Sequence, residues 1–345
     1  MLLKIIYDHL TMKVHKKTYL KWFVSLIVII VVSFCTDLLG IIKVKVITDI
    51  YEKVVDSIPY DILVSLWFRI IVATLIIITL ILLVYKPKLY LCRHTSLFPN
   101  IGDVDEYYKE HYWIKAIELD QTSDFSESYP DKASIKHLDE VALQLSNNTP
   151  KSRCGYYGIA HTPMIFRFGF KMGDSGRNVM LFHKLRHGEV NFNELSDVPD
   201  GKGVYVFEKN KSIKSDELIV SIATSAQINE QNLVDLDPKN KHIIMFDSLN
   251  YDVDYITSKV TIQYIKDSIL TYVRMRVKEY GIQKLHIVIA SSVAFTFALG
   301  QSFSNQMDPQ IVVYHYANGT YYWGICVNKD YDDPKCIEFT SACDN

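Results

Sequence analysis

The chain has 345 residues, a net charge of −2 and a hydrophobic fraction of 49%. This length accommodates two or three folded units, and the near-neutral charge argues against a protein that binds a long nucleic-acid polymer. The apolar residues are unevenly distributed, because two long runs fall within residues 22–85. Composition therefore predicts a membrane-associated segment followed by a soluble region.

Two apolar runs near the start are each long enough to cross a bilayer. Trp22–Ile42 has 21 residues interrupted only by Asp37, and Ile62–Tyr85 has 24 residues interrupted only by Arg69. A hydrocarbon core of about 30 Å requires about 20 helical residues. Lysines are concentrated before the first run and after the second, so the positive-inside rule places both ends in the cytoplasm. The sequence predicts a two-pass hairpin with a cytoplasmic N-terminus and a cytoplasmic C-terminal domain.

Asp37 and Arg69 are the charged residues within these runs. Each lies roughly 22–24 Å from the cytoplasmic interface at 1.5 Å of helical rise per residue. A single charge costs about 3 kcal/mol near the membrane centre and less towards either face. Two interpretations remain open: the two side chains pair within or between hairpins, or both extend to the outer interface.

The chain is expected to divide into five segments. Residues 1–21 are basic, with apolar residues at helical spacing, which fits a helix on the inner leaflet or a plain basic anchor. Residues 22–85 form the hairpin, and the polar, mixed residues 86–111 are expected to be a linker or neck. The α/β units are expected at residues 112–216 and 217–345.

Strand-like runs alternate with helices over the soluble part, which favours a largely parallel, doubly wound α/β sheet. The longest predicted helix, Ser258–Tyr280, places apolar residues on one broad face and is followed by Gly281. Another helix is expected to begin near Pro163. The predicted strands are Tyr112–Leu119, Glu140–Ser146, Val204–Glu208, Glu217–Ala223, His242–Phe246, Leu285–Ile289 and Ile311–Tyr316.

An internal repeat relates two parts of this region. Ile159–Phe192 aligns without a gap with the segment 131 residues later, so that Phe166 matches Phe297 and Gly169 matches Gly300. Glycine inside a helix costs roughly 1 kcal/mol relative to alanine, so we expect these glycines to permit close helix–sheet contact. The repeat fits two ordinary α/β units with similar packing, or a duplicated Rossmann-like fold with one ligand site across a pseudo-two-fold axis.

Polar residues at predicted strand ends and helix starts are the candidate ligand contacts. A helix N-terminus binds phosphate through free backbone N–H groups, which suits a near-neutral protein. Ser and Thr at these places are also ordinary N-caps, and His161 is either a cap or core histidine or a contact to phosphate or base. Tyrosines are candidate base-stacking platforms, and Arg153 and Arg186 could add charge. The candidates are Ser146, Asn147, Tyr157, His161, Thr162, Thr224, Ser225, Ser291, Ser292 and Tyr322.

No enzyme motif or metal-binding pattern occurs in the sequence. The six cysteines show no CxxC or Cys/His spacing, and Walker, GxGxxG, HExxH and GxSxG motifs are absent. We therefore expect no catalytic residue, no metal ion and no cofactor.

Two stretches resemble the halves of a SAVED domain. GYYGIAHTPMIFRFGFKMGD, continuing to VMLFHKLR, is similar to the first half, and KLHIVIASSVAFTFALGQSFSN, continuing to IVVYHYANGTYYWGICVN, is similar to the second. The resemblance covers roughly residues 112–330. It implies an α/β fold of two fused CARF-like Rossmann units, here preceded by an α-helical transmembrane hairpin.

The resemblance also implies a function. SAVED domains bind cyclic oligonucleotides in CBASS anti-phage systems, so the expected partner is a cyclic di-, tri- or tetranucleotide that contains adenine. Many members carry a nuclease or protease effector, whereas this chain carries predicted membrane helices and looks like a two-transmembrane SAVED effector of the bacterial inner membrane. We expect ligand-induced homo-oligomers to cluster the hairpins and disrupt the lipid bilayer.

Two alternatives stay open on the sequence. The chain could be a membrane-bound ring nuclease that degrades its ligand, as some CARF-type proteins do. It could also be a non-catalytic membrane scaffold that recruits a partner.

Overall fold

A computed structural model describes residues 73–74, 85–125, 129–148, 152–173, 179–184 and 191–340. The chain divides into two compact units, Met1–Lys86 and Pro87–Asn345. The N-terminal segment, nearly all of the predicted hairpin, and Asp37 and Arg69 lie outside the described residues. In the part of the chain that is described, no helix has the length and apolar character needed to span a bilayer.

The first half of the second unit is built on a five-stranded sheet of order β2-β1-β3-β4-β5. The first four strands run parallel, and β5 is antiparallel to β4. The strands are β1 (Lys88–Thr95), β2 (Trp113–Asp120), β3 (Arg153–Ile159), β4 (Val179–His183) and β5 (Asn193–Glu194), and the helices are α6 (Glu106–His111), α7 (Lys132–Asn148) and α8 (Thr162–Met172).

The second half is built on a seven-stranded sheet of order β12-β11-β10-β9-β7-β8-β6. Its central strands β8, β7, β9 and β10 are parallel, and antiparallel strands extend it on both sides. The strands are β6 (Val204–Lys209), β7 (Glu217–Ala223), β8 (His242–Ser248), β9 (Lys284–Ala290), β10 (Gln310–Ala317), β11 (Thr320–Cys326) and β12 (Ile337–Phe339). The helices are α9 (Lys259–Tyr280), α10 (Val293–Ser302) and the 3-10 helices η2 (Glu230–Leu236) and η3 (Pro238–Asn240).

The predicted repeat is confirmed in the order and bounds of the elements. A shift of 131 residues carries β3 onto β9 end to end, and it carries the first residues of α8 and β4 onto those of α10 and β10. The neighbouring pairs also correspond, because β1 pairs with β3 as β7 pairs with β9. The two halves therefore share one topology, with β5 in the place of β11, and the second sheet is extended by β12 on one side and β6 on the other.

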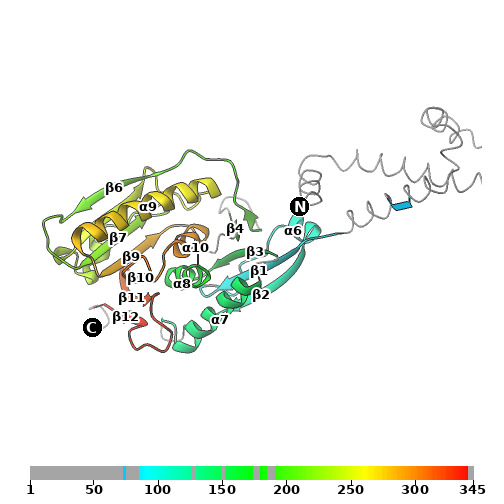
Figure 1. Ribbon diagram of the computed structural model, residues 1–345, viewed down its shortest axis with the longest axis horizontal. Helices are drawn as coiled ribbons and strands as arrows, with labels where there is room; N and C mark the ends of the chain where they lie inside the picture. The colour runs from blue at the N-terminus through cyan, green and yellow to red at the C-terminus, as the bar shows by residue number, and fades with distance from the viewer. Residues whose placement is uncertain are drawn as a thin grey trace, which may run out of the picture. The chain divides into compact units, whose positions relative to one another are not determined.

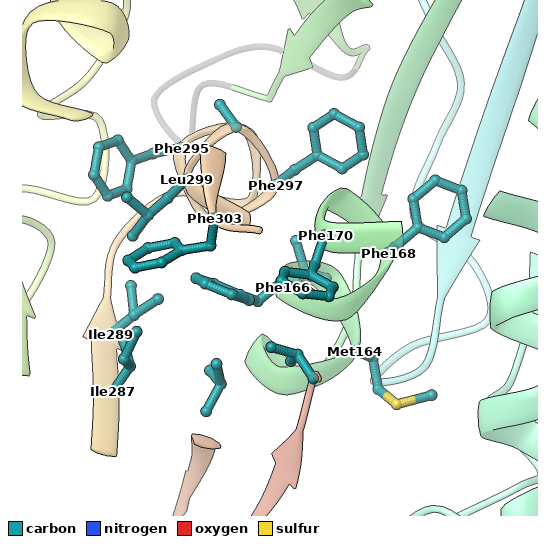
Figure 2. Packing of buried hydrophobic residues seen from close by; sticks show 14 of the residues in the cluster. Met164, Phe166, Phe168, Phe170, Ile287, Ile289, Phe295, Phe297, Leu299 and Phe303 are labelled. Atoms are coloured by element: carbon teal, nitrogen blue, oxygen red, sulfur yellow. The ribbon is translucent and has the colours of Figure 1, made fainter. Parts of the chain in front are cut away.

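The equivalent helices α8 and α10 pack against each other where the two halves meet (Figure 1). Both helices are almost entirely apolar on their buried faces, and Phe166 of α8 lies 5.6 Å from Phe303, measured between ring centroids (Figure 2). Gly169 and Gly300 lie at this junction, each against the backbone of the other helix. The prediction that these glycines permit close helix–sheet contact is therefore wrong. They permit a close contact between two helices.

Glu140–Ser146, predicted as a strand, is instead part of the helix α7. Within those seven residues the apolar positions alternate, which imitates a strand. Over the longer segment, apolar side chains recur at three- and four-residue spacing and are buried, which is the helical pattern. These buried residues are Ile135, Leu138, Val141, Ala142 and Leu145.

Two boundaries differ from the expected division. Residues 86–111, expected as a linker, contain the strand β1 and the helix α6, and β1 lies between β2 and β3. The strand β6, expected in the first α/β unit (residues 112–216), pairs with β8 in the second sheet. Both differences arise because strand pairing over long sequence separations is not visible in local composition.

Candidate functional site

Each half builds the same backbone arrangement where its central strands end. In the first half, the N–H groups of Ser96 and Leu97 donate to the Ile159 carbonyl at 3.2 and 3.4 Å. In the second half, the N–H groups of Thr224 and Ser225 donate to the Ala290 carbonyl at 2.8 and 3.0 Å. Ile159 and Ala290 are equivalent in the repeat. The carboxyl ends of parallel strands are where ligands bind in open α/β sheets.

Next to these backbone hydrogen bonds, each half has a hydrogen-bonded pair of polar side chains. In the first half, the Ser96 hydroxyl lies 2.7 Å from His161 Nδ1. In the second half, the hydroxyls of Thr224 and Ser291 lie 2.7 Å apart. Ser96 and Thr224 follow equivalent strands, but their partners differ by one position in the repeat, because His161 corresponds to Ser292 and Ser291 corresponds to Ala160.

The hydrogen bonds of Ser96 favour one tautomer of His161. The Ser96 hydroxyl oxygen accepts from the His161 backbone N–H at 2.8 Å, so the hydroxyl proton is available to donate to Nδ1. Burial, together with the neighbouring His315 and His94, lowers the pKa of His161 to about 3, so the ring is neutral at pH 7. A neutral imidazole that accepts at Nδ1 carries its proton at Nε2. His161 therefore presents an uncharged N–H donor.

His161 joins the two halves of the site. Its ring centroid lies 4.6 Å from that of His315, which is on β10 of the second sheet. The Phe125 ring stacks on His161 at 3.9 Å with an interplanar angle of 16°, and Trp323 of β11 lies 6.2 Å away. We call Phe125, His161, His315 and Trp323 the aromatic cluster. It contains side chains from both sheets at the carboxyl ends of β3 and β10.

The aromatic cluster is uncharged and carries one unsatisfied donor. Burial lowers the pKa of His315 to about 4, so this ring is also neutral at pH 7. Trp323 is fully buried, and its Nε1–H has no hydrogen-bond partner in the described part of the chain. A buried donor without a partner carries a desolvation cost of about 1–3 kcal/mol. The cluster is therefore aromatic, with neutral rings and N–H groups, and carries no fixed positive charge.

The two helix starts differ in how they are capped. Ser292 caps α10, because its hydroxyl accepts from the Phe295 N–H at 3.3 Å. His161 stands at the same position of α8 but makes no side-chain cap hydrogen bond, and Pro163 follows in the first turn. The capping interpretation thus holds for Ser292 and not for His161. The first turn of α8 lacks the side-chain acceptor that α10 has.

Six of the predicted site residues lie just after the carboxyl ends of parallel strands, two in the first half and four in the second. Tyr322 lies near them, with its ring 6.5 Å from His315. The six are His161, Thr162, Thr224, Ser225, Ser291 and Ser292.

The remaining candidates lie elsewhere. Ser146 and Asn147 are in the last turn of α7, which returns to the starting edge of the sheet before β3, because a crossover helix runs opposite to its strands. Tyr157 is buried on the other face of the first sheet, where its hydroxyl donates to Asp103 at 3.2 Å. Arg153 is at the start of β3 and donates to the Tyr112 hydroxyl. Arg186 lies outside the described residues.

Four residues of the site were not identified from the sequence: Ser96, Phe125, His315 and Trp323. Ser96 follows β1, which was assigned to the linker. His315 lies within the predicted strand Ile311–Tyr316, and Trp323 lies outside the predicted strands and stands out only as the counterpart of Phe192 in the repeat. No local pattern identifies Phe125, because its contact with His161 depends on how the chain after β2 folds back.

Comparisons with known proteins add to this geometry. The profile of SAVED, the SMODS-associated and fused to various effectors sensor domain, matches residues 135–327. The structure of the Acinetobacter baumannii Cap4 SAVED/CARF-domain containing receptor with the cyclic trinucleotide 2'3'3'-cAAA is similar at 13% identity and a TM-score of 0.49, covering 74% of this chain and 58% of that chain. The Moraxella osloensis Cap4 SAVED/CARF-domain containing receptor is similar at 15% identity and a TM-score of 0.43, covering 80% and 63%. This chain thus spans less than two thirds of the length of those receptors.

No curated protein sequence gave a significant match. The profile match covers more than half of the chain and includes both copies of the repeated strand and helix, from β3 to β11. The duplicated α/β topology therefore lies within the residues that the profile matches. The chain belongs to the SAVED family of sensor domains.

Proposed function

We propose that this protein senses a cyclic oligonucleotide in bacterial anti-phage defence of the CBASS type. The observation that carries the proposal is the contact between His161 and His315, because it joins the strand ends of two duplicated units. A cyclic oligonucleotide presents repeated bases and phosphates, which suit a site built twice. The A. baumannii Cap4 receptor was solved with a cyclic trinucleotide, and the same class of ligand is proposed for this chain.

The chemistry of the site supports a ligand of this class. Stacking of a base on an aromatic ring contributes about 1–3 kcal/mol, and the aromatic cluster supplies neutral rings of this kind. At the start of α8 the proposed phosphate contact is the backbone N–H of Thr162, because Pro163 has no N–H and the Met164 N–H donates to the His161 carbonyl at 3.0 Å. The Nε2–H of His161 is a donor suited to a ring nitrogen of adenine. Base recognition by neutral donors and phosphate binding by backbone groups require no basic surface.

The ligand is proposed to act by binding rather than by being cleaved. An imidazole with a pKa of about 3 or 4, as in His161 and His315, is a weak general base at pH 7. Incubation with labelled cyclic oligoadenylate should leave the ring intact. Accumulation of linear product would favour the ring-nuclease alternative.

The response is proposed to occur at the membrane. Two predicted spans anchor the sensor in the bacterial inner membrane, and ligand binding favours a state that stacks head to tail. Stacking raises the local concentration of hairpins, which disrupts the bilayer and kills the infected cell. Clustered hairpins would also bring Asp37 and Arg69 of several copies together. Cells that make the cognate nucleotide should lose membrane potential, and persistent polarisation despite demonstrated binding would refute this step.

The binding step is tested by thermal shift of the full chain against a panel of cyclic di-, tri- and tetranucleotides. A ligand at 100 times its dissociation constant stabilises the folded state by about 2.7 kcal/mol. His161→Ala should abolish the shift, whereas His137→Ala, which removes an exposed histidine from α7, should retain it. A full shift in His161→Ala would contradict the proposed site.

A further inference from the structure

We propose that the edge of the five-stranded sheet at which β1, β2 and β3 begin is a docking surface for anionic lipid headgroups. The inference rests on the proposed membrane anchoring and goes beyond it, because it assigns lipid contact to the sensor domain itself. The surface is formed by Lys88, Tyr112, Trp113, Lys115 and Arg153, and we call it the strand-start surface.

The strands β1, β2 and β3 lie side by side in the first sheet (Figure 1). Lys88 is paired with Trp113 across β1 and β2, and Leu89 is paired with Arg153 across β1 and β3, so Arg153 points to the opposite face of the sheet from Lys88 and Trp113. The backbone N–H of Trp113 donates to the carbonyl of Pro87 at 3.0 Å. An indole and two cationic side chains therefore lie at the edge where the chain enters this unit.

The side chains of this surface are exposed and amphipathic. Trp113 is 62% exposed, and Lys88, Lys115 and Arg153 are exposed as well. The Tyr112 hydroxyl accepts from Arg153 at 2.6 Å. Tryptophan and tyrosine concentrate at membrane interfaces, where the ring contacts acyl chains and the polar group meets the headgroups.

The charges of the surface favour anionic lipid. Its three cationic side chains are accompanied by no carboxylate among the five residues. On β2 the nearest acidic side chain, Glu118, bonds to Arg93 at 3.2 Å, and on α6 Glu106 pairs with Lys109 at 3.2 Å. Glu110 is a neighbour along the chain, and Glu194, which acts electrostatically on Tyr112, pairs with Lys259. Lysine and arginine close to an anionic leaflet are attracted to it over roughly a Debye length, about 8–10 Å.

Chain length requires this edge to lie near the bilayer if the second predicted span is inserted. Lys88 is three residues after Tyr85, where the span ends, so it lies within roughly 11 Å of that end at 3.3–3.6 Å per residue. The neighbouring strand adds about 4.8 Å. The headgroup region on each side of the hydrocarbon is about 5–7 Å thick. The opposite edge of the sheet is about 23 Å further away, since β1 has eight residues.

The experiment uses the full chain in vesicles that contain lipids with a doxyl quencher near the headgroup end of the acyl chain. The chain has four tryptophans, Trp22, Trp67, Trp113 and Trp323. The fluorescence of Trp113 is obtained by subtracting the fluorescence of Trp113→Phe from that of the natural chain. We expect the quencher to reduce the Trp113 fluorescence by about twofold in vesicles rich in phosphatidylglycerol. Unchanged Trp113 fluorescence would overturn the proposal.

A matched control moves the indole to the other edge. Phe98 follows β1 at its carboxyl end and is 60% exposed, so Phe98→Trp in the Trp113→Phe chain should show no quenching of the new residue. Equal quenching at both positions would indicate non-specific contact and would also overturn the proposal.

A second quencher, placed near the tail end of the acyl chain, separates this inference from the anchoring on which it rests. Quenching of Trp22 and Trp67 without quenching of Trp113 would leave the anchoring intact and refute the strand-start surface. Absence of quenching at all three positions would refute the anchoring itself.

The headgroup charge is tested by Lys88→Glu combined with Lys115→Glu. This double variant should abolish the difference in Trp113 quenching between phosphatidylglycerol-rich and phosphatidylcholine vesicles. The matched double variant Lys214→Glu with Lys239→Glu, at exposed positions of the second half, should retain it. Retention of the lipid dependence in the first variant would refute a role for anionic headgroups.

Discussion

Gly169 and Gly300 make the same contact in opposite directions. A Cβ atom on Gly169 would lie closer than 3.0 Å to the carbonyl oxygen of Phe297, and a Cβ atom on Gly300 would lie equally close to that of Phe166. Phe166 and Phe297 are themselves equivalent in the repeat. The reciprocity places a pseudo-two-fold axis between α8 and α10.

Substitution at these glycines should therefore destabilise the junction between the halves. Gly169→Ala and Gly300→Ala each force backbone atoms of two helices apart, and overpacking of this kind typically costs about 1–3 kcal/mol. Urea denaturation should show a lower midpoint for both variants. Gly203→Ala is the control, because its added methyl would meet only the Tyr264 ring at 3.6 Å, an ordinary contact. A midpoint for Gly169→Ala equal to that of this control would contradict the close packing.

Arg167 forms a buried ion pair that connects the halves. Its guanidinium bonds to both oxygens of Asp139 at 2.8 and 2.7 Å and donates to the Cys326 carbonyl at 3.2 Å. The bonds to Asp139 raise the pKa of Arg167 despite the opposing effect of burial. Arg167→Met leaves Asp139 with only the more distant Lys171 at 3.5 Å and should lower the free energy of unfolding by about 3–5 kcal/mol.

A double variant and a surface variant test that interpretation. Arg167→Met combined with Asp139→Leu should recover part of the loss, because no buried charge is then left without its partner. Lys136→Met breaks an exposed pair with Glu140 and should change the free energy of unfolding by less than about 0.5 kcal/mol. If the double variant is less stable than Arg167→Met alone, the unpaired carboxylate is not the cause.

The neutral histidines make stability depend on pH. The pKa values of His94, His161 and His315 are lowered to about 4, 3 and 4, chiefly by burial. Below pH 6.5 the unfolded chain takes up protons at these positions and the folded chain does not. Stability is therefore full above pH 6.5 and falls as pH decreases towards 4, by up to about 1.4 kcal/mol per pH unit for each histidine.

The histidine contribution is measured by urea midpoints between pH 7 and pH 5. This window lies above the pKa of Glu217, which its bond to His286 and nearby lysines lower to about 2. His161→Asn should make the fall in unfolding free energy with decreasing pH shallower, by about the contribution of one histidine. The same substitution at the exposed His137 should leave the slope unchanged.

Because the Nε1–H of Trp323 is unsatisfied, we expect Trp323→Phe and Trp323→Ala to differ strongly in their effect on stability. Trp323→Phe removes a buried donor whose desolvation costs about 1–3 kcal/mol, which offsets the lost volume. Phenylalanine already occupies the equivalent position, Phe192. We expect Trp323→Phe to stay within about 1 kcal/mol of the natural chain and Trp323→Ala to lose about 3–5 kcal/mol. Similar losses in both variants would show that the indole N–H is satisfied.

The sequence by itself determined the repeat, the second half of the fold and most of the strand-end positions. Glu217–Ala223 and the region of α9 were predicted nearly to the residue, because buried parallel strands and a capped amphipathic helix have patterns contained within their own residues. The same holds for Thr224 and Ser291, which follow predicted strands.

Only the tertiary structure decided which residues meet. Glu140–Ser146 looks like a strand until the helical spacing of its neighbours is included, and β1 becomes recognisable only by its pairing with β2 and β3. The stacking of Phe125 on His161, and the contact of His161 with His315, join residues far apart in the chain. Local sequence specifies where a side chain can point along a strand or helix, whereas the packing of α8 on α10 fixes which strand ends face each other.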